Sequence, residues 1–191
     1  MSEKLKKTNA VLGLLTIMLL FIHTGFNVFC YMTMFYDPVL KKVFSLPLIV
    51  VFCLHAVLGM SLVFMSSDGT GPALYPGYNK YTIAQRISAA LLFPALLIHL
   101  RTFALMSTGA EAGNAAVIVL LIIVEILFFG TVFTHISVSF SRALITLGLL
   151  SSREKQRSID KAMIMICAVF FIVSVIVVVR TQLIMFMGQG R

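Results

Sequence analysis

The chain has 191 residues, of which 60% are hydrophobic and only 12% are charged. A soluble domain carries about 25% charged residues, so the composition excludes an ordinary water-soluble enzyme and predicts a polytopic membrane protein. The net charge of +8 does not indicate a nucleic-acid-binding protein, because the Lys and Arg residues lie mostly at the edges of apolar runs, where they set membrane topology.

Five apolar runs, each long enough for a bilayer crossing of about 20 residues, predict an all-α bundle of five transmembrane helices. In chain order, the helices are expected at residues 10–31, 44–65, 82–106, 115–149 and 162–187, within a single transmembrane domain over residues 1–191. The segment SSREKQRSIDK is expected to connect the last two. The fourth helix exceeds one crossing, so we expect it to tilt or to project from the membrane.

The distribution of positive charge predicts the orientation of the bundle. One side carries Lys4, Lys6, Lys7, Lys80, Arg86, Arg142, Arg153, Lys155, Arg157 and Lys161, and the other carries Lys41, Lys42, Arg101, Arg180 and Arg191. Cytoplasmic loops of membrane proteins hold the excess of Lys and Arg. The N-terminus is therefore expected in the cytoplasm and the C-terminus outside.

The chain has four histidines, one in each of the first four predicted helices: His23, His55, His99 and His135. A single histidine within a span can serve as a hydrogen-bonding contact between helices. Ionisable residues inside membranes are nevertheless rare and usually functional. One histidine on each of four consecutive helices, with none in a loop, favours a functional set.

Helical rise places these histidines at two depths. Counted from the cytoplasmic helix ends at 1.5 Å per residue, His23 and His99 lie about 20 Å deep, whereas His55 and His135 lie about 15 and 10 Å deep. Two imidazoles at one depth on facing helices can bind a haem iron from both sides. The pattern therefore allows two haems stacked across the membrane, with Gly59, one turn after His55, leaving room for a macrocycle.

Polar residues one helical turn away are candidates to orient the imidazoles. Thr131 and Ser139 flank His135, and Asn27 follows His23 by one turn. Their side chains could hydrogen-bond the ring nitrogen that does not bind iron.

Three arginines are candidate partners of haem propionates. Arg142 lies two turns from His135 on the same helical face, and Arg86 and Arg101 are further candidates. The alternative for each is that the guanidinium reaches out to the membrane interface. Pro94 is expected to kink the third helix, because proline removes a backbone donor.

Glu125 is the only acidic residue inside a predicted span. A buried carboxyl at the level of His99 could take a proton from a quinol, which makes Glu125 a candidate catalytic residue of a quinone site. The alternative is a structural acid paired with Arg101 or another polar side chain.

Four stretches resemble a known family. "AQRIS…IHL", "LPLIVVFCLHAVLG", "HTGFNVF" and "VFTHISVSFSRALITLG" are similar to the four histidine-bearing helices of the cytochrome b membrane-anchor subunits of succinate:quinone oxidoreductases (succinate dehydrogenase and fumarate reductase). The likeness is to the five-helix, di-haem type, and the fifth helix matches only in kind. The resemblance implies that His23 and His99 bind the distal haem, and that His55 and His135 bind the proximal haem.

The resemblance also implies partners and a location. A flavoprotein and an iron–sulfur subunit would bind at the cytoplasmic face of a bacterial inner membrane, and the complex could form a higher oligomer. The dicarboxylate chemistry would lie in those partners, while this chain would exchange electrons with a quinone, expected to be menaquinone. The alternatives are a transporter or proton-relay protein that uses the histidines and Glu125 without haem, and a structural anchor without a cofactor.

Overall fold

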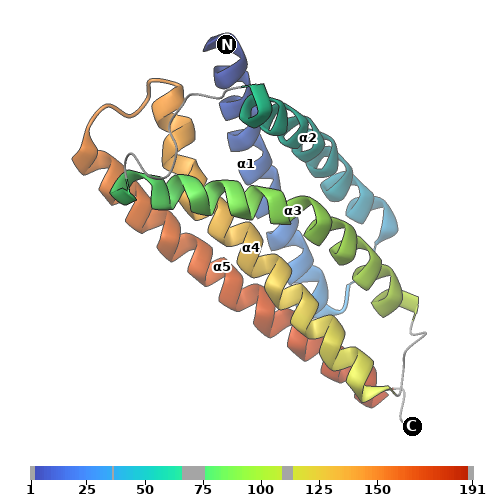
Figure 1. The fold of residues 1–191 in the computed structure, drawn as a ribbon. Coiled ribbons are helices and arrows are strands. Elements are labelled where there is room, and N and C mark those ends of the chain that lie inside the picture. The colour runs from blue at the N-terminus through green and yellow to red at the C-terminus, as the bar shows by residue number, and fades with distance from the viewer. Residues whose placement is uncertain (1–2, 36, 66–75, 109–113, 189–191) are drawn as a thin grey trace.

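The computed structural model describes residues 3–35, 37–65, 76–108 and 114–188. In these ranges the regular structure consists of five α-helices and contains no strand (Figure 1). The helices are α1 (Glu3–Thr33), α2 (Pro38–Met65), α3 (Pro76–Thr108), α4 (Ala115–Thr146) and α5 (Arg153–Gly188). The predicted all-α class is confirmed.

All five helices are long and apolar enough to cross a membrane, which makes this a multi-pass membrane protein by length and composition. Their outward faces carry exposed apolar side chains, such as Leu127 (64% exposed) and Val169 (60% exposed). Apolar surface of this extent around a whole bundle is suited to lipid rather than to water.

Four of the helices begin six to nine residues before their predicted starts, because each helix extends beyond its apolar run into polar residues. Charged residues continue α1 outward, and Lys7 pairs with Glu3 one turn away at 2.6 Å. Asp37 caps α2 by accepting hydrogen bonds from the backbone of Val39 and Leu40.

The charged segment before the fifth span was expected to be a connection, and this prediction is wrong. Helix α5 already begins at Arg153, where the hydroxyl of Ser152 accepts a hydrogen bond from the backbone amide of Lys155. Helix α4, expected to reach residue 149, ends at Thr146. The chain turns there through Gly148, whose φ of 75° is readily adopted by glycine.

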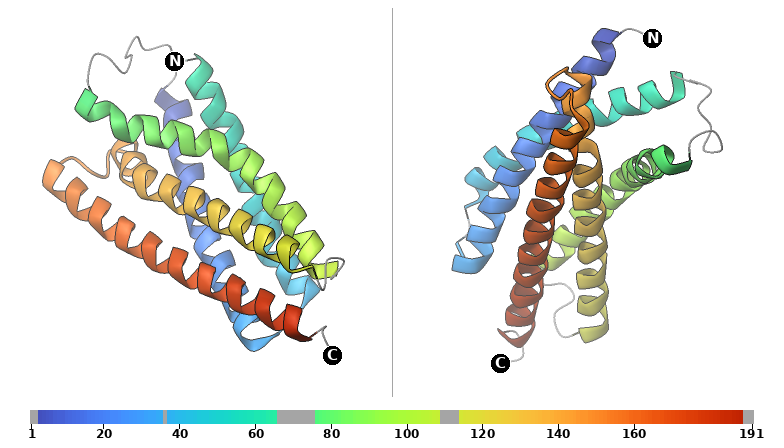
Figure 2. Two further views of the ribbon diagram at one scale, coloured as in Figure 1. Left: turned by 60° about the horizontal axis from the view of Figure 1, so that its bottom comes forward. Right: turned by 90° about the vertical axis from the view of Figure 1, so that its left-hand side faces the viewer.

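Successive helices run in opposite directions, so α1 begins and α5 ends at opposite ends of the bundle (Figures 1 and 2). Helix α4 is central and packs against α1, α3 and α5, while α1 also packs against α2 and α5. Helix α3 bends near its middle, where Pro94 lies (Figure 1). A proline in a helix interior removes one hydrogen bond and kinks the axis, as expected for this position.

The buried core lies where α3, α4 and α5 meet. It consists of Leu92, Val132, Phe133, Ile136, Met163 and Cys167, with phenylalanines packed around it. Phe133 is 5% exposed, and its ring centroid lies 6.3 Å from that of Phe170 on α5. This core joins α4 to its neighbours and so holds the histidine-bearing helices in place.

We expect Phe133→Ala to destabilise the folded protein by about 3 kcal/mol, because it leaves a cavity that the bundle cannot close. Leu127→Ala, on the exposed face of the same helix, should cost far less. Thermal or denaturant unfolding in detergent, followed by circular dichroism, compares the two variants. Equal losses of unfolding free energy in the two variants would show that Phe133 does not lie in a stabilising core.

Candidate functional site: two levels of paired histidines

The four histidines lie at two levels along the bundle. His23 on α1 is near enough to His99 on α3 to be influenced by its charge, and the same holds for His135 on α4 and His55 on α2. These are the pairs that helical rise predicts. We call them the His23–His99 level and the His55–His135 level.

His99 has the most strongly polar surroundings of the four. Its Nδ1 lies 2.6 Å from Oε2 of Glu125 on α4, whose side chain is buried. The ring stacks on Phe128, with centroids 4.3 Å apart and planes 12° apart, and Phe129 approaches its edge. Both the hydrogen bond and the stacking hold the imidazole in one orientation.

His23 is hydrogen-bonded through both ring nitrogens. The amide nitrogen of Asn27 lies 2.8 Å from Nε2 and also donates to the backbone carbonyl of His23. The hydroxyl of Ser45 on α2 lies 3.5 Å from Nδ1 and donates to the carbonyl of Lys41. An amide that donates to Nε2 and a hydroxyl that accepts from Nδ1 together favour the neutral tautomer protonated on Nδ1.

His55 lies against α1. Its Nδ1 is 3.2 Å from the backbone carbonyl oxygen of Asn9, which can only accept, so this nitrogen carries the proton. The ring packs on Gly13, where an added Cβ would lie only 3.0 Å from the ring carbon Cε1. Gly13 therefore lets the imidazole approach the backbone of α1.

His135 lies against α3. Its Nδ1 is 3.0 Å from the hydroxyl of Ser88, which is buried and itself donates to the carbonyl of Ala84. Two turns away, Arg142 of α4 donates a 2.6 Å hydrogen bond to the side-chain oxygen of Gln85 on α3. These two contacts join α3 and α4 at the same end of the bundle.

The contacts cross in a regular way, because each of α1 to α4 provides a histidine at one level and a partner atom at the other. The partner atoms are the carbonyl of Asn9 on α1, the hydroxyl of Ser45 on α2, the hydroxyl of Ser88 on α3 and the carboxylate of Glu125 on α4. On each helix the two contributions are 10 to 14 residues apart. The two levels are therefore separated by roughly 15–20 Å along the helix axes.

Some residues singled out in the sequence lie elsewhere. Arg86 and Arg101 are exposed on α3, and Arg142 is half-buried and bonded to Gln85. Glu125 lies at the level of His99 as expected, and it pairs with that histidine rather than with Arg101.

The expected orienting role of Thr131 and Ser139 is wrong. Thr131 donates to the carbonyl of Leu127, and the buried hydroxyl of Ser139 has no partner within the described residues. The Nδ1 atom of His135 meets the hydroxyl of Ser88 on α3, so residues on its own helix do not contact this nitrogen. Gly59 is also not the glycine in contact with an imidazole: a Cβ there would meet Asn9 at an ordinary 3.8 Å.

Three residues of the site were not expected to take part. Asn9, Gly13 and Ser45 contact histidines from a neighbouring helix. A single glycine or serine in an apolar helix carries no local pattern that marks such a contact. The contact of Ser88 with His135 was not expected either.

The residues fit axial ligation of haem at three of the four histidines. His55, His99 and His135 each engage Nδ1, and within the described ranges their Nε2 atoms make no hydrogen bond. An imidazole held through one nitrogen presents the other to a metal. At His23 the amide of Asn27 occupies Nε2, so this amide must move aside before iron can bind there.

No cluster of three or more His, Cys, Asp and Glu side chains suited to a bare metal ion occurs in the described part of the chain. A haem iron needs only two protein ligands, because the porphyrin nitrogens supply the remaining four. Two imidazoles per level match that number.

Comparisons of the chain with models of protein families, with curated proteins and with solved structures find no match.

We expect Glu125→Leu to lower the free energy of unfolding by about 1–3 kcal/mol, because the buried Nδ1 of His99 loses its partner. Glu125→Gln keeps an acceptor oxygen and should cost less. Denaturant unfolding of both variants in detergent measures the difference. Wild-type stability of the Leu variant would show that this hydrogen bond does not contribute to the fold.

Proposed function

We propose that this chain is the di-haem membrane-anchor and electron-transfer subunit of a succinate:quinone oxidoreductase. It would carry two b-type haems and pass electrons between a cytoplasmic iron–sulfur subunit and a membrane quinone, such as menaquinone. The observation that carries the proposal is the crossed pattern of contacts, in which each of α1 to α4 provides one imidazole at one level and a hydrogen-bond partner for another imidazole at the other level. The four sequence stretches that resemble the family's histidine-bearing helices support the same function.

The residues of this chain would hold and orient the cofactors. His23 and His99 would bind the distal haem, and His55 and His135 the proximal haem. Each bound haem would supply reversible one-electron transfer. The partners on Nδ1 orient the rings of His55, His99 and His135, which would leave Nε2 of each to hold the iron, while at His23 the amide of Asn27 would first have to leave Nε2. Among the three arginines, Arg142 is the best-placed propionate partner, because it lies near the His55–His135 level.

Glu125 is the proposed acid of the quinone reaction. A buried carboxyl at the His23–His99 level could hold a proton during quinol oxidation or quinone reduction. Its 2.6 Å contact with His99 would bring this proton next to the distal haem ligand. The Oε1 atom of Glu125 has no partner within the described residues and could receive a proton or a hydrogen bond.

The uneven distribution of Lys and Arg supports an N-terminus in the cytoplasm of a bacterium and a C-terminus outside. A flavoprotein and the iron–sulfur subunit would then bind at the end where α1, α3 and α5 begin. The His55–His135 level is nearer to this end, so electrons would reach it first from the iron–sulfur subunit during succinate oxidation.

A proton-relay or transport protein without haem is the second candidate. The buried Glu125–His99 pair favours it, since acid–imidazole pairs inside membranes often lie on proton paths. In this case the two histidine levels would exchange protons rather than electrons.

Absorption spectroscopy of the purified protein separates these functions. We expect a reduced-minus-oxidised spectrum of b-type haem and a pyridine haemochrome content of about two haems per chain, because two axial imidazoles serve each iron. A protein purified from cells supplied with haem precursors that lacks a Soret band would exclude the electron-transfer function.

Double variants test the pairing. His23→Ala combined with His99→Ala removes both ligands of one level, so we expect one haem per chain to remain. His23→Ala combined with His55→Ala removes one ligand from each level and should lose both haems or leave both weakly bound. Haem content and circular dichroism are measured together. Equal haem loss in the two well-folded double variants would contradict the pairing.

A further inference from the structure

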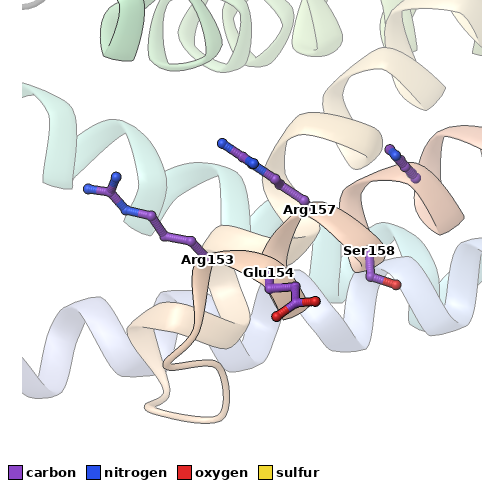
Figure 3. A pocket seen from close by; sticks show the side chains of 5 residues that line it. Arg153, Glu154, Arg157 and Ser158 are labelled. Carbon is purple, nitrogen blue, oxygen red and sulfur yellow. The ribbon is translucent and has the colours of Figure 1, made fainter.

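The first half of α5 carries two hollows that lie one after the other along the helix. The first, about 660 Å³ in volume, is lined by Arg153, Glu154, Arg157, Ser158 and Lys161 (Figure 3). The second, about 240 Å³, is lined by apolar side chains alone: Met165, Ile166, Val169 and Phe170. The apolar hollow thus begins four residues after Lys161, the last cation of the first hollow.

The three cations share one side of the helix. Arg153, Arg157 and Lys161 follow at intervals of four residues, which brings their side chains onto neighbouring positions of the same face. Figure 3 shows Arg153 and Arg157 extending from the helix to one side, whereas Glu154 points in a different direction. Within the described residues none of these three cations forms an ion pair, so their charge is available to an external anion.

The apolar hollow faces outward. Met165 is 64% exposed and Val169 is 60% exposed, whereas the buried face of the same helix carries Met163 and Cys167. In a membrane-spanning bundle this outward surface meets acyl chains. An occupant of both hollows must therefore combine an anionic group with a hydrocarbon chain.

We propose that this face of α5 binds an anionic glycerophospholipid. Its phosphate would lie among Arg153, Arg157 and Lys161, with the Ser158 hydroxyl as a further donor, and one acyl chain would lie along Met165, Ile166 and Val169. Lys161 and Val169 are eight residues apart, or about 12 Å, which fits within the roughly 15 Å of hydrocarbon in one leaflet.

A lipid fits better than a protein surface because of the apolar part. A soluble acidic partner could meet the arginines, but it would not reach a hollow four to nine residues deeper in the span. Clusters of Lys and Arg at the membrane end of a helix attract anionic lipid headgroups. The inference does not depend on haem and would hold if the proposed function failed.

The test is lipid binding to the full-length, delipidated protein in detergent, measured by native mass spectrometry. The probes are phosphatidylglycerol and phosphatidylcholine with the same acyl chains. We expect Arg153→Gln/Arg157→Gln/Lys161→Gln to weaken phosphatidylglycerol binding on the order of 100-fold, or about fivefold for each cation. The matched control is Lys4→Gln/Lys6→Gln/Lys7→Gln, which removes the same charge from the same end of the bundle and should change binding little.

A second variant examines the apolar hollow. Val169→Trp should fill it and weaken binding of long-chain phosphatidylglycerol several-fold, although every cation is retained. Inorganic phosphate should not compete. The proposal is overturned if the triple variant binds as wild type, if the control loses as much, or if phosphatidylcholine binds equally well. A triple variant that keeps its lipid but loses a co-purifying protein would indicate a protein-binding surface instead.

Discussion

The structure depends on the need of a half-buried imidazole for a hydrogen-bond partner where lipid, not water, surrounds the bundle. Unpaired polar groups are costly in such surroundings. Each of the four histidines satisfies Nδ1 with an oxygen from a neighbouring helix, and no two use the same residue. The same contacts therefore orient the rings and join α1 to α2 and α3 to α4. The geometry of the site thus depends on the register of these helix pairs.

This constraint makes the two levels chemically unequal. At the His23–His99 level one histidine faces a carboxylate, whereas at the His55–His135 level the partners are a backbone carbonyl and a hydroxyl. A carboxylate raises the basicity of the imidazole that it contacts more strongly than a neutral oxygen does. Under the proposed function, the two haems would therefore have different axial-ligand strengths although all four ligands are histidines.

Helix α5 has a different role from the other four. It carries no histidine, and its inner face packs Met163 and Cys167 against the core of α4. Further along, this face buries Ser174 and Thr181, whose hydroxyls have no side-chain partner in the described part of the chain. Its outer face carries the two hollows proposed to hold a lipid. The helix thus supports the histidine-bearing helices from outside and contacts the membrane through its other side.

The amino-acid sequence alone determined the number of spans and the presence of histidines at two levels. The length of an apolar run decides whether a helix can cross the membrane. The constant rise of a helix converts a residue count into a depth, so the spans and the depths of the histidines both follow from the local sequence. Depth along α4 also placed Glu125 near His99.

Tertiary structure decided which atoms meet. Ser45, Ser88 and Gly13 lie next to histidines because of how the helices rotate and cross, and no spacing within one helix contains that information. For the same reason Thr131 and Ser139, the neighbours of His135 in sequence, do not contact its ring. Residue spacing gives the depth of a side chain, but only the packing of helices gives the direction in which it finds a partner.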